Sequence, residues 1–524
     1  MDLELNDLQQ NRRQKAELLR QLRFDPYASR AARTHTTAEA IAHFTAFETE
    51  HEAGTADERE LTVAGRLVSR RDMGKTVFAH IRDGHGQLQL YLRVNDLGDE
   101  RFEQFNRLAD LGDFVQATGR LFRTRTGEIS LRAREITILT KALNAPPEKW
   151  KGLQDVEIRY RQRYADLIAN SDVRLVFEQR ARMITAIRQF LDDQGFIEVE
   201  TPTLQPLYGG AAARPFTTHH NALDQTFYLR IADELYLKRL IAGGYERVYE
   251  ICKDFRNEGM DRNHQPEFTM LEWYEAYADY RTVMDRAEAL FIHVAQRVHG
   301  SERFSTGGHE IDLSPPWRRV TLREAIKNGS GIDYVEYPDT EELTRVARAA
   351  GAEIPTGMVW PRIVDELLKQ FVRPRIAEPT ILYDYPVELS PLAKRKSDDP
   401  THAERFQIYI AGHELANAFT ELNDPIDQLG RFLDQARDRA AGDEEAMPID
   451  LDYVNALMYG MPPTGGIGIG IDRLAMFISD QSNIRDVILF PAMRKLPIGG
   501  LASLAVEGED DVVTGGDGIS EGDE

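Results

Sequence analysis

The stretch from residue 255 to residue 274, FRNEGMDRNHQPEFTMLEWY, constrains the fold of this chain more than any other segment. It follows an apolar run at residues 247–252, and its first half contains glycine, asparagine and proline, which favour turns. In its second half apolar and polar residues alternate, so that Phe268, Met270, Glu272 and Tyr274 fall on one face of an extended chain. The pattern predicts two strands joined by a polar loop. A surface hairpin with scattered charges remains the alternative on the residues alone.

The same stretch resembles a known family. FRNEG…HQPEF is similar to motif 2 of the class II aminoacyl-tRNA synthetases, and EFTMLEWYEAYADY resembles the version of that motif in bacterial-type lysyl-tRNA synthetases of class IIb. The likeness runs from about Arg12 to Pro497. It implies an α+β fold, in which an N-terminal OB-fold β-barrel precedes a class II catalytic domain with an antiparallel β-sheet flanked by helices. It also implies a lysine–tRNA ligase, which activates L-lysine with ATP, releases pyrophosphate, and transfers lysine to the 3′ end of tRNA(Lys).

Length and charge are compatible with that expectation. A chain of 524 residues can form two or three domains with substantial cores. The net charge of −22 argues against indiscriminate nucleic-acid binding, because phosphate contacts need lysine and arginine. Residues 61–141 nevertheless carry 14 Lys and Arg against 10 Asp and Glu. A mildly basic module on an acidic body favours one local contact with a polyanion.

The cellular setting follows from cysteine content and hydropathy. Cys252 is the single cysteine, which excludes an internal disulfide framework and favours a reducing cytoplasm. It lies in an apolar run, so we expect a core residue and not a nucleophile. The sequence has no apolar run of 18 or more residues, and its N-terminus is polar and acidic. We therefore expect neither a signal peptide nor a membrane span.

The order of patterns along the chain predicts its domains. Residues 1–60 are expected to be a helical extension, with a charged amphipathic helix that ends near Pro26. Residues 61–141 form the barrel, and the proline-containing stretch 142–152 is a linker. Residues 153–500 form the catalytic domain, with a helical insertion at about 296–385. The last segment, 501–524, has eight acidic and no basic residues and is predicted to be disordered.

Five short alternating runs between residues 61 and 139, separated by glycines, predict the barrel strands. OB-folds bind single strands by stacking bases on aromatic side chains beside a basic groove, and Phe78 with its basic neighbours fits that description. A generic barrel with Phe78 in its core is the alternative. By resemblance to the anticodon-binding domain, the positions expected to contact anticodon bases are Arg71, Phe78, Gln89 and Glu128.

A long helical period begins the catalytic domain and is followed by FIEVETPTL, which predicts a strand broken by Pro202. This segment, residues 172–204, resembles motif 1, which implies a homodimer interface. An ordinary buried helix–strand pair is the alternative. Further on, the family resemblance matches Gly210 and Glu234 to the amino-acid pocket. Asp233 stands where the family usually has proline, a change that removes no ligand.

Two later segments complete the expected site. In HELANAFTELND (413–424), Glu414, Asn417 and Glu421 are separated by odd and even steps, so a regular strand would divide them between its faces. In GGIGIGIDRLAMFI (465–478), a glycine-rich run leads into a helix that begins near Asp472. The second segment resembles motif 3, in which Arg473 reaches the γ-phosphate of ATP.

The resemblance assigns a role to each matched residue. It implies catalytic roles for Arg256, Glu414 and Arg473, and up to three Mg²⁺ ions held partly by Glu414 and Glu421, the latter shared with the substrate ammonium. The expected ATP-binding residues are Arg256, Glu258, His264, Gln265, Phe268, Glu414 and Arg473. The expected lysine-binding residues are Gly210, Glu234, Glu272, Tyr274, Asn417, Phe419, Glu421, Gly466 and Gly470.

Two rival functions are left open. A protein-lysylating paralogue would share the catalytic core but lack the OB-fold. A catalytically silent tRNA-binding homologue would be expected to have lost Arg256, Glu414 or Arg473, and all three are present.

Overall fold

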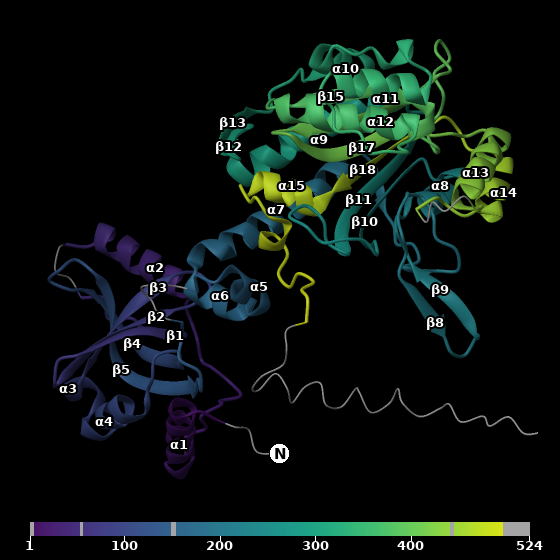
Figure 1. Cartoon of the computed structure of the whole chain (residues 1–524). Coiled ribbons are helices and arrows are strands. Elements are labelled where there is room, and N and C mark those ends of the chain that lie inside the picture. Colours follow the sequence, from purple (N-terminus) through teal and green to yellow (C-terminus); the bar gives the residue numbers. More distant parts are fainter. Residues whose placement is uncertain (1–4, 53–55, 148–152, 441–444, 496–524) are drawn as a thin grey trace, which may run out of the picture. The chain divides into compact units, whose positions relative to one another are not determined.

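A computed structural model describes residues 5–52, 56–147, 153–440 and 445–495. These residues divide into two compact units, one containing the barrel and the other containing residues 154–493 (Figure 1). The predicted acidic tail at 501–524 and residues 148–152 of the predicted linker lie outside the described residues.

The first unit is built around a closed five-stranded barrel with the strand order β1-β2-β3-β5-β4. Its strands alternate buried and solvent-facing residues, as in β2, so one set of side chains fills the barrel and the other faces outward. The predicted OB-fold strands are confirmed with small changes in their ends. The strands are β1 (Glu60–Asp72), β2 (Thr76–Arg82), β3 (Gln87–Arg93), β4 (Phe114–Arg123) and β5 (Ile129–Thr140).

Helices accompany the barrel in the first unit. The predicted amphipathic helix is present as α1, which begins with a capping box at Asn6 and Gln9 and buries Ala16 and Leu19. The short alternating runs of this region predicted strands only, and they did not predict the two helices between β3 and β4. The helices are α1 (Asp7–Gln21), α2 (Thr37–Glu50), α3 (Val94–Leu97) and α4 (Asp99–Leu108).

The second unit is organised by an eight-stranded sheet with the order β14-β15-β16-β17-β18-β11-β10-β6. The predicted strand pair is β10 and β11, which are antiparallel with Glu250 opposite Glu272. The sheet is antiparallel except at its two edges, where β6 and β14 pair in parallel with their neighbours. Its strands are β6 (Ile197–Glu198), β10 (Arg247–Phe255), β11 (Glu267–Ala276), β14 (Arg318–Thr321), β15 (Thr380–Pro386), β16 (His402–Ile410), β17 (His413–Thr420) and β18 (Thr464–Gly470).

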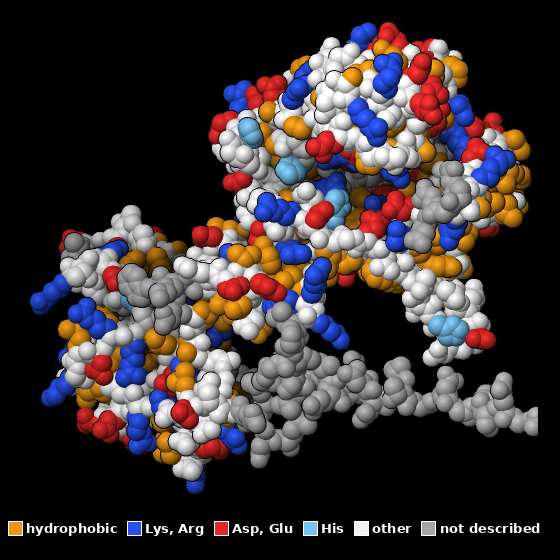
Figure 2. All heavy atoms as spheres, in the orientation of Figure 1, with side chains coloured by type: hydrophobic (Ala, Val, Ile, Leu, Met, Phe, Trp, Pro, Cys, Tyr) orange, Lys and Arg blue, Asp and Glu red, His pale blue; other side chains and the backbone are white. Residues whose placement is uncertain are grey.

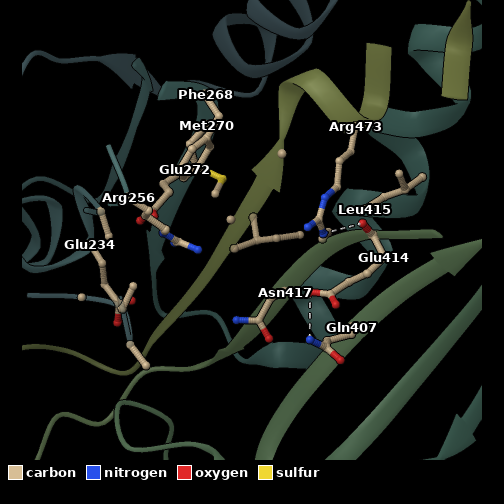
Figure 3. A pocket seen from close by; sticks show the side chains of 18 of the residues that line it. Glu234, Arg256, Phe268, Met270, Glu272, Gln407, Glu414, Leu415, Asn417 and Arg473 are labelled. Carbon is tan, nitrogen blue, oxygen red and sulfur yellow. Dashed lines mark hydrogen bonds between the residues drawn. The ribbon is translucent and has the colours of Figure 1, made fainter. Parts of the chain in front are cut away.

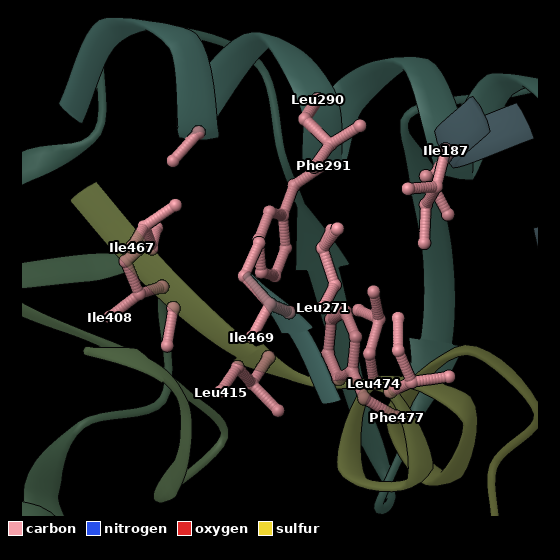
Figure 4. Packing of buried hydrophobic residues seen from close by; sticks show 14 of the residues in the cluster. Ile187, Leu271, Leu290, Phe291, Ile408, Leu415, Ile467, Ile469, Leu474 and Phe477 are labelled. Atoms are coloured by element: carbon pink, nitrogen blue, oxygen red, sulfur yellow. The ribbon is translucent and has the colours of Figure 1, made fainter. Parts of the chain in front are cut away.

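The two faces of this sheet differ in chemistry. Leu271 and Trp273 of β11, and Ile467 and Ile469 of β18, point to the core, where they pack against α7, α9 and α15. Figure 4 shows Leu290 and Phe291 of α9 beside the core-facing strand residues, with α15 below them. Because side chains alternate along a strand, the intervening polar residues face the opposite side. The polar side is where the cavity described below is formed.

Helices of the second unit cover the core or extend from it. The long helix predicted from residue 172 is α7, and it ends two residues before Gly195 as expected. The helices are α5 (Val156–Arg161), α6 (Arg163–Ala169), α7 (Ser171–Asp193), α8 (Glu234–Ala242), α9 (Tyr280–His299), α10 (Leu322–Ser330), α11 (Thr340–Ala349), α12 (Trp360–Leu367), α13 (Pro425–Ala440), α14 (Leu451–Met458) and α15 (Ile471–Ile478).

Two local predictions need correction. The strand expected in FIEVETPTL is reduced to β6 and to β7 (Leu204–Gln205), because Pro202 and its neighbours interrupt the pairing. The region at about 296–385, expected to be a helical insertion, also holds β14 and β15 of the main sheet and a hairpin. Short apolar strands next to long helical periods were missed there. The smaller strands are β8 (Thr217–His220), β9 (Gln225–Leu229), β12 (Arg303–Thr306) and β13 (His309–Asp312).

Candidate active site and nucleic-acid surface

A cavity of about 460 Å³ lies on the polar face of the large sheet, a size typical of small-molecule sites. Figure 2 shows a hollow on this unit where charged side chains of both signs and histidine gather. The structure brings to this one cavity every residue that the sequence predicted for ATP or lysine. They are Gly210, Glu234, Arg256, Glu258, His264, Gln265, Phe268, Glu272, Tyr274, Glu414, Asn417, Phe419, Glu421, Gly466, Gly470 and Arg473.

The floor of the cavity is the glycine-rich strand β18. Gly466 lies opposite Tyr274 on one side and Phe419 on the other. A Cβ atom at Gly466 would lie 2.2 Å from Glu421 Oε1 and 2.5 Å from Tyr274 Cε1, closer than any real contact. At Gly468 the nearest atom would be 3.8 Å away. Glycine is therefore required at residue 466 because the neighbouring side chains occupy the space of its Cβ.

A bulge in β17 explains how Glu414 and Asn417 can face the same side, although residues three positions apart on a regular strand face opposite sides. Ala416 pairs with Ile408, but Glu414 pairs with Tyr409, so β17 holds one extra residue at this point. An extra residue shifts the alternation of side chains by one position. Glu414 consequently faces the cavity together with Asn417 and Phe419. Figure 3 shows Glu414 and Asn417 on the same side of the strand.

One end of the cavity is acidic and enclosed. Glu234 is the first residue of α8, and Glu421 immediately follows β17; both are buried. The Lys238 ammonium forms ion pairs with both carboxylates and is itself fully buried. Burial opposes the charge on Lys238, but Glu234 and Glu421 outweigh it and raise the pKa of this lysine. The acidic end thus already contains one ammonium group of the protein.

A second group of acids lies beside it. Tyr274 donates a hydrogen bond to Glu272 Oε2 at 2.8 Å. Burial, then the charges of Glu234 and Asp254, raise the pKa of Glu272 to about 8. The carboxyl of Asp233 contacts that of Glu272, and burial followed by the Glu272 charge raises the pKa of Asp233 well above its usual value. Two carboxyl groups in contact need a proton between them.

The effect of Asp233 was underestimated from the sequence. It was expected to alter only the local backbone, but it places a fully buried carboxyl among Glu250, Asp254 and Glu272. Asp233 occupies the N-cap position of α8, yet its side chain makes no capping hydrogen bond. Neither of its oxygens receives a hydrogen bond from a donor group within the described residues. The Asp233 carboxyl lies against Glu272, which lines the cavity, and the sequence pattern did not reveal this contact.

The other end of the cavity is basic and more open. The guanidinium of Arg256 lies over the Phe268 ring, 5.0 Å from its centroid, and points into the cavity in Figure 3. Arg473 Nη2 donates to His264 Nε2 at 2.9 Å, and His264 Nδ1 lies 2.8 Å from an oxygen of Asp261. Because arginine can only donate, Nε2 is the acceptor and the ring proton sits on Nδ1, directed at Asp261. Two arginines therefore face a space suited to an anion.

Gln265 adds evidence that this end binds a polar ligand. Its side chain is buried and lines the cavity. Neither its amide nitrogen nor its amide oxygen has a hydrogen-bond partner within the described part of the chain. Buried amides are normally satisfied, so an orphaned one facing a cavity calls for a ligand that carries both a donor and an acceptor. The edge of a purine base has that chemistry.

The two carboxylates predicted to bind metal lie at different ends of the cavity. Glu414 accepts a hydrogen bond from Gln407 Nε2 at 3.0 Å, and its backbone carbonyl accepts one from Arg473 at 3.3 Å. Glu421 immediately follows β17 and contacts Lys238 at the acidic end, whereas Glu414 adjoins Arg473 at the basic end. The metal-binding role of both carboxylates stays a prediction.

The first unit carries an aromatic strip on its outer surface. Phe78 of β2 lies 5.0 Å from Tyr91 of β3, and Tyr91 lies 5.4 Å from Phe122 of β4, between ring centroids. Arg71 lies opposite Phe78 in the strand register and is exposed. Phe78 is partly exposed and does not fill the barrel, so the alternative of a core phenylalanine is wrong. The arrangement offers flat faces beside a cation.

A hydrogen-bond network lies on the same strands. Glu128 accepts from Gln89 Nε2 at 2.7 Å, and His80 Nε2 lies 2.8 Å from the other oxygen of Glu128. Ser130 donates to Gln89 Oε1, and Ser69 lies 2.7 Å from His80 Nδ1. The network presents a carboxylate acceptor beside an amide donor. The predicted residues Gln89 and Glu128 are therefore hydrogen-bonded to each other, and His80, which was not predicted, belongs to the same network.

Comparison with known proteins assigns both units. Residues 155–494 match the family described as tRNA synthetases class II (D, K and N), and residues 61–139 match the OB-fold nucleic acid binding domain. A lysine–tRNA ligase of Chloroflexus aurantiacus is 55% identical over 494 residues, which cover 94% of this chain and 99% of that protein.

The chain belongs to the class II tRNA synthetases.

Further relatives support this membership. Lysine–tRNA ligases of Roseiflexus castenholzii and Pelotomaculum thermopropionicum are 54% and 52% identical to this synthetase over 94% of its chain, and these matches cover 99% and 96% of the two proteins. The predicted family and fold class are therefore confirmed. No helix in the described ranges of this synthetase has the length and apolar character needed to cross a membrane.

Several cavity residues of this synthetase were missed by sequence reasoning. Arg405 of β16 donates to Asn417 Oδ1 at 2.8 Å, and Gln407 holds Glu414. Arg405 and Gln407 alternate with buried Phe406 and Ile408, and this alternation could have identified them. Where one face of a strand is apolar, the charged and amide residues of its other face point to a polar space. Lys238 could not have been found this way, because helical periodicity simply predicted a surface or core position. Other missed cavity residues are Ala211, Asn263, Met270, Ser390 and Gly468.

Proposed function

We propose that this synthetase activates L-lysine with ATP to form lysyl-adenylate and then transfers lysine to the 3′ end of tRNA(Lys). The observation that carries the proposal is the polarity of the cavity, with buried carboxylates at one end and two arginines at the other. An amino acid with a charged ammonium side chain fits the acidic end, and the phosphates of a nucleotide fit the basic end. The names of the relatives support lysine as the amino acid.

The proposed roles at the acidic end follow from charge. Glu234 and Glu421 bind the substrate ε-ammonium, and Glu272, with Tyr274 on its carboxylate, binds the α-ammonium. Asn417 and Phe419 form one wall, and Gly210, Gly466 and Gly470 leave room for the substrate. An amino acid with an anionic side chain is excluded, because its charge would be buried beside Glu234 and Glu421, and Lys238 is already paired with both.

The proposed roles at the basic end concern ATP. Phe268 stacks with the adenine, and Gln265 and Glu258 contact its edge. The substrate carboxylate attacks the α-phosphorus, the bond from that phosphorus to the bridging oxygen breaks, and pyrophosphate leaves. Arg256 neutralises the charge that develops on the reacting groups, and His264 and Arg473 hold the outer phosphates. The attacking carboxylate is already ionised, so positioning and charge stabilisation carry the step without a general base.

Mg²⁺ is part of the proposal at Glu414 only. One or two carboxylates together with substrate phosphates are the usual protein ligands of Mg²⁺, and Glu414 beside Arg473 provides such a donor. When bound there, the ion would neutralise phosphate charge. In the second step the ribose hydroxyl oxygen at the 3′ end of tRNA attacks the lysyl carbonyl carbon and forms the ester. The bond between that carbon and the phosphate oxygen breaks, AMP leaves with the electron pair on its phosphate oxygen, and the hydroxyl proton is released.

The barrel is proposed to read the anticodon. Phe78 and its aromatic neighbours stack bases, and Arg71 contacts the nucleic acid beside them. Glu128 and Gln89 present an acceptor next to a donor, which matches the Watson–Crick edge of uridine, where N3–H is a donor and O4 an acceptor. The barrel also argues against a protein-lysylating paralogue, which would lack it. Retained Arg256, Glu414 and Arg473 argue against a silent homologue.

Assembly and location complete the proposal. We infer a cytoplasmic homodimer that uses residues 172–204. Leu175 of α7 is 54% exposed, Ile197 is 50% exposed and Leu204 is 48% exposed, which leaves apolar surface for a partner copy. Analytical ultracentrifugation of the purified chain tests this proposal, since a monomer at micromolar concentration would contradict it.

Lysine-dependent exchange of pyrophosphate into ATP, without tRNA and across all twenty amino acids, tests the activity. Exchange with lysine and no other amino acid is the expected result. Exchange with a different amino acid would retain the fold and overturn the specificity. Absence of exchange at both low and high salt would favour the silent homologue.

A further inference from the structure

Lys238 is enclosed directly behind the acidic end of the cavity. It lies one turn after Glu234 on α8, and its side chain has no exposed surface. Its ammonium contacts Glu234 and Glu421, and it lies 5.2 Å from the Phe419 ring centroid and 5.8 Å from that of Tyr274. Every one of these four neighbours also lines the cavity. The lysine thus contacts the walls of the substrate site without being part of its surface.

The charges at this end require such a group. Two carboxylates buried side by side are costly unless a cation neutralises them. When Glu234 and Glu421 are both ionised, Lys238 balances one of their two charges. In the empty site burial raises the pKa of both carboxyls, and one further ammonium, which is the charge of a lysine side chain, would balance the second charge.

The geometry also leaves room for that second ammonium. Lys238 contacts Glu421 Oε2, whereas Glu421 Oε1 has no hydrogen-bond partner among the described residues and lies beside Gly466 of the cavity floor. A carboxylate has about four acceptor positions and an ammonium has three donors. Glu421 therefore keeps acceptor positions on Oε1 for an incoming ligand while its charge is already partly compensated.

We propose that Lys238 is a positioning residue, an internal counter-ion that holds Glu234 and Glu421 in their substrate-binding arrangement when no lysine is bound. In the empty site it is the cation between the two glutamates, and in the loaded site the substrate ammonium shares them. The inference rests on the proposed function, because it takes the acidic end as the site for the substrate ammonium. A residue needed only for packing would have no such relation to the substrate.

The first test compares thermal unfolding of Lys238→Met with and without lysine. We expect Tm without lysine to fall by roughly 5–10 °C, since breaking a buried charge pair leaves an uncompensated charge. Saturating lysine should raise Tm of the variant by more than it raises Tm of the wild type, because the substrate is then the only ammonium in the site. Norleucine, the neutral isostere of lysine, should not produce the larger rise.

Leu237→Ala is the matched control. Leu237 precedes Lys238 on α8 and is also fully buried, but it belongs to the apolar core. Its variant should lose Tm to the same extent with and without lysine. If Lys238→Met behaves like this control, Lys238 acts through packing and the proposal is overturned.

A second test needs no substrate and remains informative if Lys238→Met is poorly stable. In the wild-type background, Glu234→Gln leaves the balanced pair of Lys238 and Glu421 and should change Tm little. In the Lys238→Met background it removes one of two uncompensated carboxylates and should raise Tm clearly or restore soluble expression. An equal change of Tm in both backgrounds would contradict an internal counter-ion. Failure of wild-type lysine-dependent exchange, with the difference between the two backgrounds present, would instead reject the proposed function.

Discussion

In the cavity the acidic residues Glu234, Glu272 and Glu421 are all buried, whereas on the barrel Glu128 and Arg71 are open to solvent. The cavity acids are coupled to one another and to Lys238 through charge, and burial strengthens each interaction. The barrel surface instead combines exposed rings with a short hydrogen-bond network around Glu128. Single substitutions should therefore have large, coupled effects in the cavity and moderate, independent effects on the barrel.

Arg256→Ala is expected to cause the largest loss of activity. Arg256 is the cavity cation proposed to neutralise developing charge, and removal of one such group costs roughly 10²–10³-fold in kcat. We expect about 10³-fold slower pyrophosphate exchange with little change in Tm, because Arg256 is only partly buried. Arg262→Ala, in the same loop but exposed, is the control. An Arg256→Ala enzyme with kcat similar to that control would show that the basic end does not carry the chemistry.

Glu421→Gln should reduce kcat/KM for lysine in the exchange reaction by about 10²-fold or more, since removal of one partner from a buried charge pair costs roughly 3–5 kcal/mol. The loss should appear mainly as a higher KM for lysine and not for ATP. Glu267→Gln, at an exposed carboxylate of β11, is the control. Unchanged lysine kinetics in Glu421→Gln would remove this residue from the substrate site.

Phe78→Ala tests the other side of the comparison. Loss of a stacked base costs roughly 1–3 kcal/mol, so aminoacylation kcat/KM for tRNA should fall about tenfold. Pyrophosphate exchange without tRNA should be unchanged. Met73→Ala, at a side chain 59% exposed after β1, is the control. A fall in tRNA-independent exchange would contradict the independence of the barrel surface from the cavity.

Gly466→Ala and Gly468→Ala compare two positions of one strand. The first places a Cβ 2.2 Å from Glu421 Oε1, and the second leaves 3.8 Å to the nearest atom. Forcing an extra methyl group into a packed site costs roughly 1–3 kcal/mol, so we expect about a tenfold higher lysine KM and a lower Tm for Gly466→Ala. Gly468→Ala should leave Tm unchanged. Equal Tm values for the two variants would show that the side chains around Gly466 move to make room for the added methyl group at little cost in stability.

The last prediction concerns the pH dependence of stability. Burial and neighbouring acids raise the pKa of Glu272 from 4.5 to about 8. Between these values the folded protein holds a proton that the unfolded chain has released, so the free energy of unfolding falls as pH rises through this window. Urea unfolding from pH 5 to pH 8.5 should show a steeper decline for wild type than for Glu272→Gln. Parallel curves would mean that Glu272 does not retain its proton.

The barrel and the cavity also differ in how far the sequence could predict them. Alternation and glycine punctuation predicted the five barrel strands, because each strand has one buried face. The helices α3 and α4 and the role of His80 were missed. Phe78 shares its face of β2 with Thr76, His80 and Arg82, so alternation within its own strand already favoured the outer surface.

Short strands were the weakest predictions in the second unit. β14 has only four residues and β6 only two, and each is stabilised by pairing with a longer strand that is distant in the sequence. Local propensity does not contain that pairing. The strand pair around residues 255–274 was predicted because its loop and its alternation are both local features.

By itself the sequence determined the residue types of the site, the two-stranded element that carries half of them, and the family resemblance that assigned their roles. Only the tertiary structure decided which of them act together. The β17 bulge turned Glu414 to the face of Asn417, and α8 brought Lys238 between Glu234 and Glu421. Asp233 was likewise directed at Glu272. Each depends on backbone register or on contacts between distant segments, and alternation within one segment contains neither.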